Sequence, residues 1–357
     1  MVIALATFTL PVSGLVSVVI RTVPGRTSYL DAALFSLQCQ DYKPLEVVVV
    51  YQGPAGADYG GLLDLLEEYR VLGLDIRLVV NPANEDQRSR NLNLGLMAAS
   101  GQYVAFLDDD DVVYARHYVN LVEAIKTSGS AWSYGNTYQA NMKFAADGSL
   151  YVASYSRPFE KHAYSFIDHY LGNFIPIHSF CVDRATEIGA ALTFDESMIR
   201  HEDYDALLRL SSQSKPAVST EFTCEYRIRL DGSNTVLAGT SDVGDFKNKS
   251  KSWAVAQLQL ERTRDRLDTS LWNREVFAEI ARLRGEVHRL SLLVNDYGGV
   301  QCESKPLRYR LSDKINSALK RLPLAHKGMR RLGTRMDRVL ESLRRQIVAR
   351  RHRSAGV

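Results

Sequence analysis

The N-terminal third of the chain alternates between short apolar runs and stretches with helical periodicity. Four apolar runs predict buried strands at residues 15–20, 45–50, 76–80 and 103–107. Between them, apolar residues recur every three to four positions and predict helices over 28–40, 62–72 and 89–100. This rhythm is typical of an α/β fold with a mixed, mostly parallel sheet and helices on both faces.

The middle of the chain is less regular. Its pattern predicts strands at 131–138, 150–155 and 179–183, a helix from Arg184 and a helix over 201–210. A turn at Asp147-Gly148 separates the first two strands. The last helix opens with the sequence HEDYD, and the helix dipole favours acidic residues in such a first turn.

After about residue 240 the pattern turns helical. Six apolar residues alternate steps of four and three: Val276, Ile280, Leu283, Val287, Leu290 and Val294. This is a heptad seam about three heptads long, and it fits a helix packed on its own domain as well as a homodimeric coiled coil. Further apolar faces follow between residues 314 and 353, where Pro323 and Gly328 separate two predicted helices.

Charge is distributed unevenly along the chain. Residues 305–357 hold 16 Lys and Arg against 3 Asp and Glu, whereas the preceding residues hold 28 basic and 38 acidic side chains. A basic tail on an acidic body suggests a separate partner for the tail, either an anionic membrane surface or nucleic acid. Because no nucleic-acid-binding motif accompanies it, nucleic acid is not the expected partner.

The first 20 residues carry no charge, which raises the question of a membrane span. Pro11, Ser13 and Gly14 interrupt them, so a strand at 15–20 is the better interpretation, and no basic segment of a signal peptide precedes it. The four cysteines are far apart and have no metal-ligand spacing, which indicates free thiols in a reducing cytosol. We expect a cytoplasmic protein, peripheral at the inner face of the plasma membrane if the tail binds there.

Four consecutive carboxylates, Asp108 to Asp111, follow directly on the predicted strand at 103–107. Adjacent anions repel one another unless positive charge compensates them, and hard oxygen ligands of this kind suit Mg²⁺ or Mn²⁺. The alternative is a solvated acidic turn that merely ends the strand. In open α/β sheets, ligands bind at the carboxyl ends of strands, which favours the cation site.

Several motifs occur in an order that resembles the family 2 glycosyltransferases of GT-A fold, over roughly residues 15–235. They are VSVVI with its loop RTVPGR, YQG after the second strand, RSRNLNLGLMAASGQYVAFLDDDD, FDE at 194–196 and the acidic pair in EDYDALLRL. Each of these motifs alone is weak evidence for the family, but their occurrence together in this order is specific for it. The resemblance implies an inverting transfer of a sugar from a nucleotide-diphosphate sugar to a hydroxyl acceptor.

The resemblance also assigns roles to residues in and around the D-x-D motif, which is Asp108-Asp109-Asp110 in this chain. It implies that Asp110 is the most direct ligand of Mg²⁺ or Mn²⁺ and that Asp108 contacts the ribose or shares the metal. Asp109 is the variable middle position of the donor site. Arg90 corresponds to the family's basic residue near the nucleotide, and Thr22 lies where the family's first loop touches the base.

For the acceptor, the resemblance implies that Asp203 is the general base and that Glu202 orients it or the acceptor. The alternative for this pair is simple capping of a helix N-terminus. Two departures affect the donor: RTVP replaces the family's usual Pro-Thr-Tyr-Asn, and Tyr51-Gln52 replaces an Asp pair that reads the base. Tyr51 can stack on the base or hydrogen-bond to it, so UDP- and dTDP-sugars both stay open.

On this basis we divide the chain into a GT-A domain over 1–240, a helical segment over 241–304 and a basic amphipathic tail over 305–357. Within the first, 15–111 is the nucleotide-binding half and 112–240 the acceptor half. The family's habits suggest a bacterial surface polysaccharide as product, with a glycan or lipid-linked acceptor. Two other functions stay open: a sugar nucleotidyltransferase, and a non-catalytic nucleotide-sugar-binding scaffold.

Overall fold

The computed structural model describes residues 10–56, 59–231 and 243–296. The chain divides into two compact units. The first comprises Met1–Glu261 with Asp268–Leu271, and the second comprises Arg262–Leu267 with Trp272–Val357. Every residue that we expect at the functional site lies in the first unit. The basic tail predicted over 305–357 lies outside the described residues.

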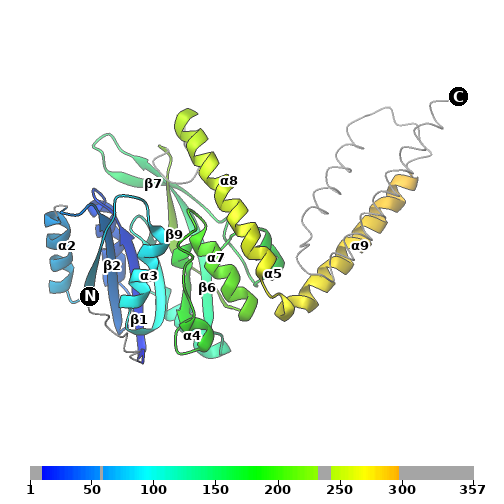
Figure 1. Cartoon of the computed structure of the whole chain (residues 1–357), viewed down its shortest axis with the longest axis horizontal. Coiled ribbons are helices and arrows are strands. Elements are labelled where there is room, and N and C mark those ends of the chain that lie inside the picture. Colours follow the sequence, from blue (N-terminus) through cyan, green and yellow to red (C-terminus); the bar gives the residue numbers. More distant parts are fainter. Residues whose placement is uncertain (1–9, 57–58, 232–242, 297–357) are drawn as a thin grey trace. The chain divides into compact units, whose positions relative to one another are not determined.

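One nine-stranded sheet organises the first unit, in the spatial order β3-β2-β1-β4-β8-β6-β9-β5, with β7 paired to β6 (Figure 1). The strands are β1 (Val12–Thr22), β2 (Leu45–Gly53), β3 (Asp75–Pro82), β4 (Gly101–Asp108), β5 (Val112–Val113), β6 (Trp132–Phe144), β7 (Leu150–Ser156), β8 (Phe180–Asp183) and β9 (Ala217–Arg229). The first four run parallel, β8 is antiparallel to both β4 and β6, and β6 and β9 run parallel. This confirms the predicted α/β fold with a mixed, mostly parallel sheet.

Helices cover both faces of the sheet, because each face carries its own apolar core. The helices are α1 (Thr27–Gln38), α2 (Gly60–Val71), α3 (Arg88–Ala98), α4 (His117–Ser128), α5 (Phe166–Leu171), η1 (Ile177–Ser179), α6 (Glu187–Ala190), α7 (Glu202–Gln213), α8 (Val243–Arg266), η2 (Ser270–Trp272) and α9 (Asn273–Asp296). Helices α1, α2 and α4 contribute to one core, while α3 and α7 contribute to the other.

Helix α3 lies very close to β1, and a glycine makes this possible. A Cβ atom added to Gly95 would lie 2.2 Å from Cγ1 of the buried Val19. Since Val has a stiff χ1 and cannot move away easily, only glycine fits here. The close packing fixes α3, and with it the loop that precedes α3, against the strand whose end carries the site.

The structure departs from the predicted elements mainly in the middle of the chain. The helix expected from Arg184 is limited to the single turn α6, and neither α4 nor β9 was predicted. Strand β9 alternates poorly in sequence (AVSTEFTCEYRIR) and nevertheless lies between β6 and β5. Long-range pairing with β6 forms this strand, because it supplies ladder hydrogen bonds that local propensity does not indicate.

The segment after residue 240 is helical, as predicted, through α8 and α9. Helix α9 contains the predicted heptad seam, most of whose side chains lie outside the described part of the chain. The homodimer suggested by that seam therefore stays a prediction. Among the described helices, none combines the length and the apolar composition that a membrane crossing requires.

Candidate active site

The carboxyl ends of β1, β2 and β4 lie side by side. The register of the sheet pairs Thr22 with Tyr51 and Arg21 with Asp108. Side chains from three segments far apart in sequence therefore meet at one edge. In an open α/β sheet this edge is the usual location of a ligand site.

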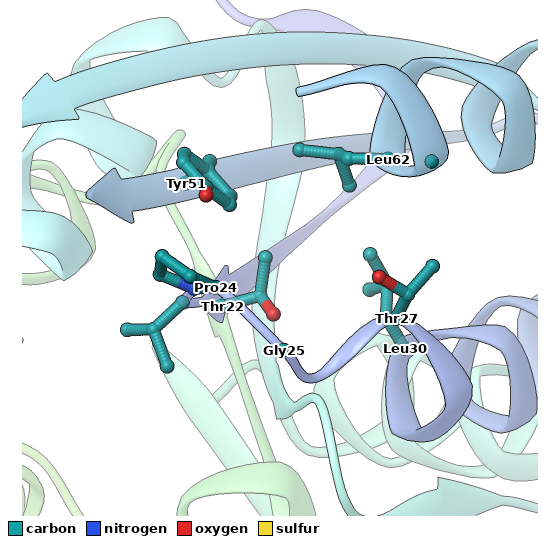
Figure 2. Close-up of a pocket in the computed structure, with 9 residues that line it drawn as sticks. Thr22, Pro24, Gly25, Thr27, Leu30, Tyr51 and Leu62 are labelled. Carbon is teal, nitrogen blue, oxygen red and sulfur yellow. The ribbon is translucent and has the colours of Figure 1, made fainter. Parts of the chain in front are cut away.

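A small pocket opens at this edge, with a volume of about 120 Å³ (Figure 2). Its lining residues are Thr22, Val23, Pro24, Gly25, Thr27, Leu30, Tyr51, Gly61 and Leu62. Figure 2 shows the Tyr51 ring of β2 across from the loop that carries Thr22 and Pro24. An aromatic ring, apolar side chains and two threonine hydroxyls form a wall suited to a flat, uncharged heterocycle.

Gln52 does not face this pocket but holds the loop before α3. Its amide nitrogen donates to the carbonyl of Glu85, and its Oε1 accepts from the backbone N–H of Gln87 and from Asn91 Nδ2 at 3.1 and 2.7 Å. Asn91 in turn accepts a hydrogen bond from Asn81 at 2.7 Å. Tyr51 and Gln52 therefore have different roles: Tyr51 lines the pocket, whereas Gln52 stabilises the loop before α3.

The first two carboxylates of the acidic run are both paired with arginines of the β1 end and its loop. Arg21 donates two hydrogen bonds to Asp108, of 2.7 and 3.1 Å. Arg26 donates to both oxygens of Asp109 at 2.6 to 2.9 Å, and Thr22 Oγ1 adds a bond of 2.6 Å. Burial opposes ionisation of Asp108, but the charge of Arg21 brings its pKa below the usual value.

The third carboxylate receives two guanidinium groups on one oxygen. Asp110 Oδ2 lies 2.9 Å from Nη2 of Arg26 and 2.8 Å from Nη1 of Arg229, the last residue of β9. Both guanidinium carbons lie 4.9 Å from the centre of the Tyr29 ring. Cation–π contacts with one ring thus help to hold both arginines beside Asp110.

The fourth carboxylate is buried and paired with a histidine. Asp111 Oδ2 lies 2.9 Å from Nδ1 of His178, and the side chains are 2% and 0% exposed. Burial alone lowers the pKa of His178, but the charges of Asp111 and Cys224 raise it above its usual value. Burial likewise opposes ionisation of Cys224, while the charge of His178 lowers its pKa to about 6. His178 therefore stabilises the acidic run through its ion pair with Asp111.

The acidic pair of α7 reaches the same edge through Arg21. Nη1 of Arg21 lies 2.5 Å from Glu202 Oε1, so a single guanidinium joins Glu202 to Asp108. Burial opposes ionisation of Glu202, but the charge of Arg21 brings its pKa below the usual value. The residue before α7, His201, adopts a left-handed conformation with φ at 62°.

Asp203 lies next to this network but has weaker partners of its own. Its oxygens accept hydrogen bonds from the backbone N–H of Tyr204 at 2.8 Å and from Asn173 at 3.4 Å. Burial, and after it the charge of Glu202, raises its pKa to about 7. A carboxylate with such a pKa can both accept and release a proton near neutral pH.

Arg90 is not among these contacts. It is 54% exposed and lies 3.8 Å from Glu196. Arg88, two residues earlier, is the α3 arginine whose charge lowers the pKa of Asp108 and Glu202. Arg21, Arg26, Arg88 and Arg229 received no role from the sequence, although Arg21 and Arg26 lie in the RTVPGR loop that carries part of the family resemblance.

The predicted Mg²⁺ or Mn²⁺ ion requires carboxylate oxygens that can turn toward it. Both oxygens of Asp108 are bound by Arg21, and one oxygen of Asp110 is bound by two arginines. In the part of the chain that the structure describes, no three His, Cys, Asp or Glu side chains converge as a metal site. In this arrangement the carboxylates do not fit a cation unless the guanidinium groups withdraw, and the ion stays a prediction.

Residues 17–184 match the family model described as glycosyl transferase family 2. The chain is 28% identical over 185 residues to the amylovoran biosynthesis glycosyltransferase AmsB of Erwinia amylovora, covering 50% of this chain and 59% of that protein. It is 32% identical over 123 residues to the GalNAc(5)-diNAcBac-PP-undecaprenol beta-1,3-glucosyltransferase of Campylobacter jejuni, covering 34% and 37%. The matched segment thus spans less than two thirds of each of these two relatives.

Among solved structures, S. aureus TarS 1–349 is similar to this chain. The protein alone, its complex with UDP and its complex with UDP-GlcNAc are each 16% identical and cover 86% of this chain and 81% of that one. The TM-scores are 0.46, 0.46 and 0.48.

The buried pair of Asp111 and His178 yields a prediction about stability. Replacing His178 by Ala should lower the free energy of unfolding by about 3 kcal/mol, because Asp111 is left as an uncompensated buried charge. The double variant His178→Ala/Asp111→Asn should regain part of this loss, as measured by urea unfolding of the four proteins of the cycle. Strictly additive losses would show that the two side chains do not form a pair.

Proposed function

Since the chain belongs to glycosyltransferase family 2, through residues 17–184, we propose that it transfers a sugar from a nucleotide-diphosphate sugar to a hydroxyl group of an acceptor. We place this activity in bacterial polysaccharide synthesis, because one relative is named for amylovoran biosynthesis. The Campylobacter relative is named as a glucosyltransferase on an undecaprenol-linked glycan, which supports a lipid-linked or glycan acceptor here.

One observation carries this proposal: Arg21 binds Asp108 at the end of β4 and Glu202 at the start of α7. The link brings the acidic pair of α7 to the edge of the sheet where the pocket of Tyr51 and Thr22 opens. A donor that fills the pocket and extends over β4 would therefore present its sugar toward Asp203. This arrangement supports a reaction between a nucleotide-linked sugar and an acceptor held near α7.

The pocket is compatible with the base of a pyrimidine nucleotide. In the described residues that line it there is no charged side chain, so recognition rests on the Tyr51 ring and the hydroxyls of Thr22 and Thr27. Aromatic stacking tolerates any flat base, and uracil and thymine differ only by a methyl group. We therefore keep both UDP- and dTDP-sugars as donors.

In the proposed reaction the acceptor oxygen attacks the anomeric carbon in line with the bond to the diphosphate. The new C–O bond forms as the old one breaks, so the anomeric configuration inverts and the nucleoside diphosphate leaves. Asp203 takes the proton of the attacking hydroxyl, for which its pKa of about 7 is suited. Glu202, held by Arg21, contributes the negative charge that keeps this pKa high.

The other two functions from the sequence receive less support. A sugar nucleotidyltransferase is not favoured by the match to the glycosyltransferase family, which runs through the strand carrying the acidic run. A scaffold that had lost catalysis would not need Asp203 with a raised pKa beside a paired Glu202. Both alternatives predict that no sugar is transferred or hydrolysed.

The first test concerns the base. Asp203→Asn should reduce sugar transfer by roughly 10²- to 10⁴-fold, the range expected for loss of a general base. Binding of the nucleoside diphosphate should persist, because the pocket lies at β1 and β2. The exposed Asp64→Asn on α2 is the control and should leave the rate unchanged. Transfer by Asp203→Asn at the wild-type rate would show that another residue is the general base.

The second test concerns pH. Because Asp203 must be ionised to accept a proton and its pKa is raised to about 7, kcat/KM should be maximal above this pH and fall about tenfold per unit below it. In Asp203→Asn this acid limb should disappear, leaving a low, flat profile. An unchanged limb in the variant would assign the titration to another group.

The third test concerns the basic tail, residues 305–357, which lie outside the described part of the chain. We propose that it binds the anionic cytoplasmic face of the membrane, where each Lys or Arg contributes up to ~1 kcal/mol. The full chain should sediment with vesicles rich in anionic lipid and be released by high salt, while a chain truncated after Ser304 should stay in the supernatant and retain donor hydrolysis. Equal sedimentation of both proteins would show that the tail is not responsible for membrane binding.

A further inference from the structure

The arginine pair on Asp110 has no role in the reaction as described so far. Arg26 and Arg229 come from the β1–α1 loop and from the end of β9, and both contact Oδ2 of Asp110. We propose that these two guanidinium groups bind the diphosphate of the donor, so that donor binding does not require a divalent cation. This inference rests on the proposed function, since it names the groups that receive the donor's phosphates.

The charges around the acidic run support this assignment. Asp108, Asp109 and Asp110 each form an ion pair with at least one arginine before any ligand arrives, although Arg21 also pairs with Glu202. A dication placed on Asp108 and Asp110 would meet guanidinium groups at hydrogen-bond distance from the same oxygens. A diphosphate brings the opposite charge and can take over bonds that the carboxylates now accept.

The position of Arg26 relative to the pocket gives the second argument. Asp109 Oδ2 accepts from Thr22 Oγ1 at 2.6 Å and from Arg26 Nε at 2.8 Å. Thr22 lines the pocket, so one carboxylate oxygen separates the pocket wall from the guanidinium. Arg26 is thus near enough to the pocket to receive the phosphates of a nucleotide whose base occupies it.

The geometry of the two arginines gives the third argument. Tyr29 lies against both guanidinium groups, 4.9 Å from each, which restrains them beside one another. Arg26 contacts the carboxylates through Nε and Nη2, so its Nη1 side is not engaged by them. The side chain of Arg26 is 26% exposed and that of Arg229 is 4% exposed, so a ligand would reach the pair through Arg26. Restrained, adjacent guanidinium groups match the oxygens of a phosphate chain.

Calorimetric titration of the full chain with UDP and with dTDP, in excess EDTA and in Mg²⁺, tests this inference. For the wild type, the better of the two nucleotides should bind in EDTA with a Kd within about threefold of that in Mg²⁺. Arg26→Gln and Arg229→Gln should each weaken binding in EDTA by roughly tenfold to a hundredfold, as expected for loss of a charged hydrogen bond. The preference of the protein for UDP over UMP should decrease in both variants.

Arg209→Gln is the matched control. Arg209 on α7 is 31% exposed and pairs with the buried Asp205 at 2.9 Å, so its loss removes a similar ion pair away from the acidic run. It should leave nucleotide binding unchanged. Because Arg229 is only 4% exposed, its variant can fail to fold; in that case Arg26→Gln decides, with thermal unfolding as a check and Arg26→Lys expected to bind between wild type and Arg26→Gln.

The outcomes separate this inference from the proposed function. Binding in EDTA that is weakened by roughly tenfold or more in Arg26→Gln but unchanged in Arg209→Gln supports the inference. Wild-type binding only with Mg²⁺, or Arg26→Gln binding as tightly as the wild type in EDTA, overturns it while the glycosyltransferase function stands. Absence of binding by the wild type in both buffers contradicts the proposed function with these donors, and the inference with it.

Discussion

The site depends on the pairing of four consecutive carboxylates with cations from elements far apart in the chain. Arg21 from β1, Arg26 from the following loop, Arg229 from β9 and His178 from η1 each bind one or two members of the run Asp108 to Asp111. Buried and half-buried charges without partners are very costly, so the run can exist only where these elements meet. The ion pairs therefore help to fix where β9 and η1 lie relative to β4.

The same pairing links the two halves of the proposed reaction. Through Arg21, the end of β4 is connected to the first turn of α7. Glu202 keeps its charge because Arg21 binds it, and that charge in turn contributes to the raised pKa of Asp203. The pKa of the proposed proton acceptor thus depends on the network that lies next to the pocket of Thr22 and Tyr51. A change in one arginine is expected to affect both donor binding and acid–base chemistry.

The first half of the fold could be predicted from the sequence because its signals are local. Strand runs and helical spacing lie within short windows, and the acidic run directly follows its strand. The partners of that run could not be predicted, since Asp110 and Arg229 are 119 positions apart and β9 has a weak strand pattern. Arg90 was assigned to the nucleotide, but on a helix residues two apart point in different directions, and Arg88 is the one near the carboxylates.

The sequence suggested that a divalent cation offsets the repulsion among the carboxylates, and in the structure arginines lie against three of them. A crystal structure of the full chain with UDP and Mn²⁺, with the ion located by its anomalous scattering, tests this account most directly. We expect the base between Thr22 and Tyr51 and the diphosphate oxygens within hydrogen-bond distance of Arg26 and Arg229. A Mn²⁺ ion bridging Asp108, Asp110 and the diphosphate, with neither arginine on a phosphate, would contradict it.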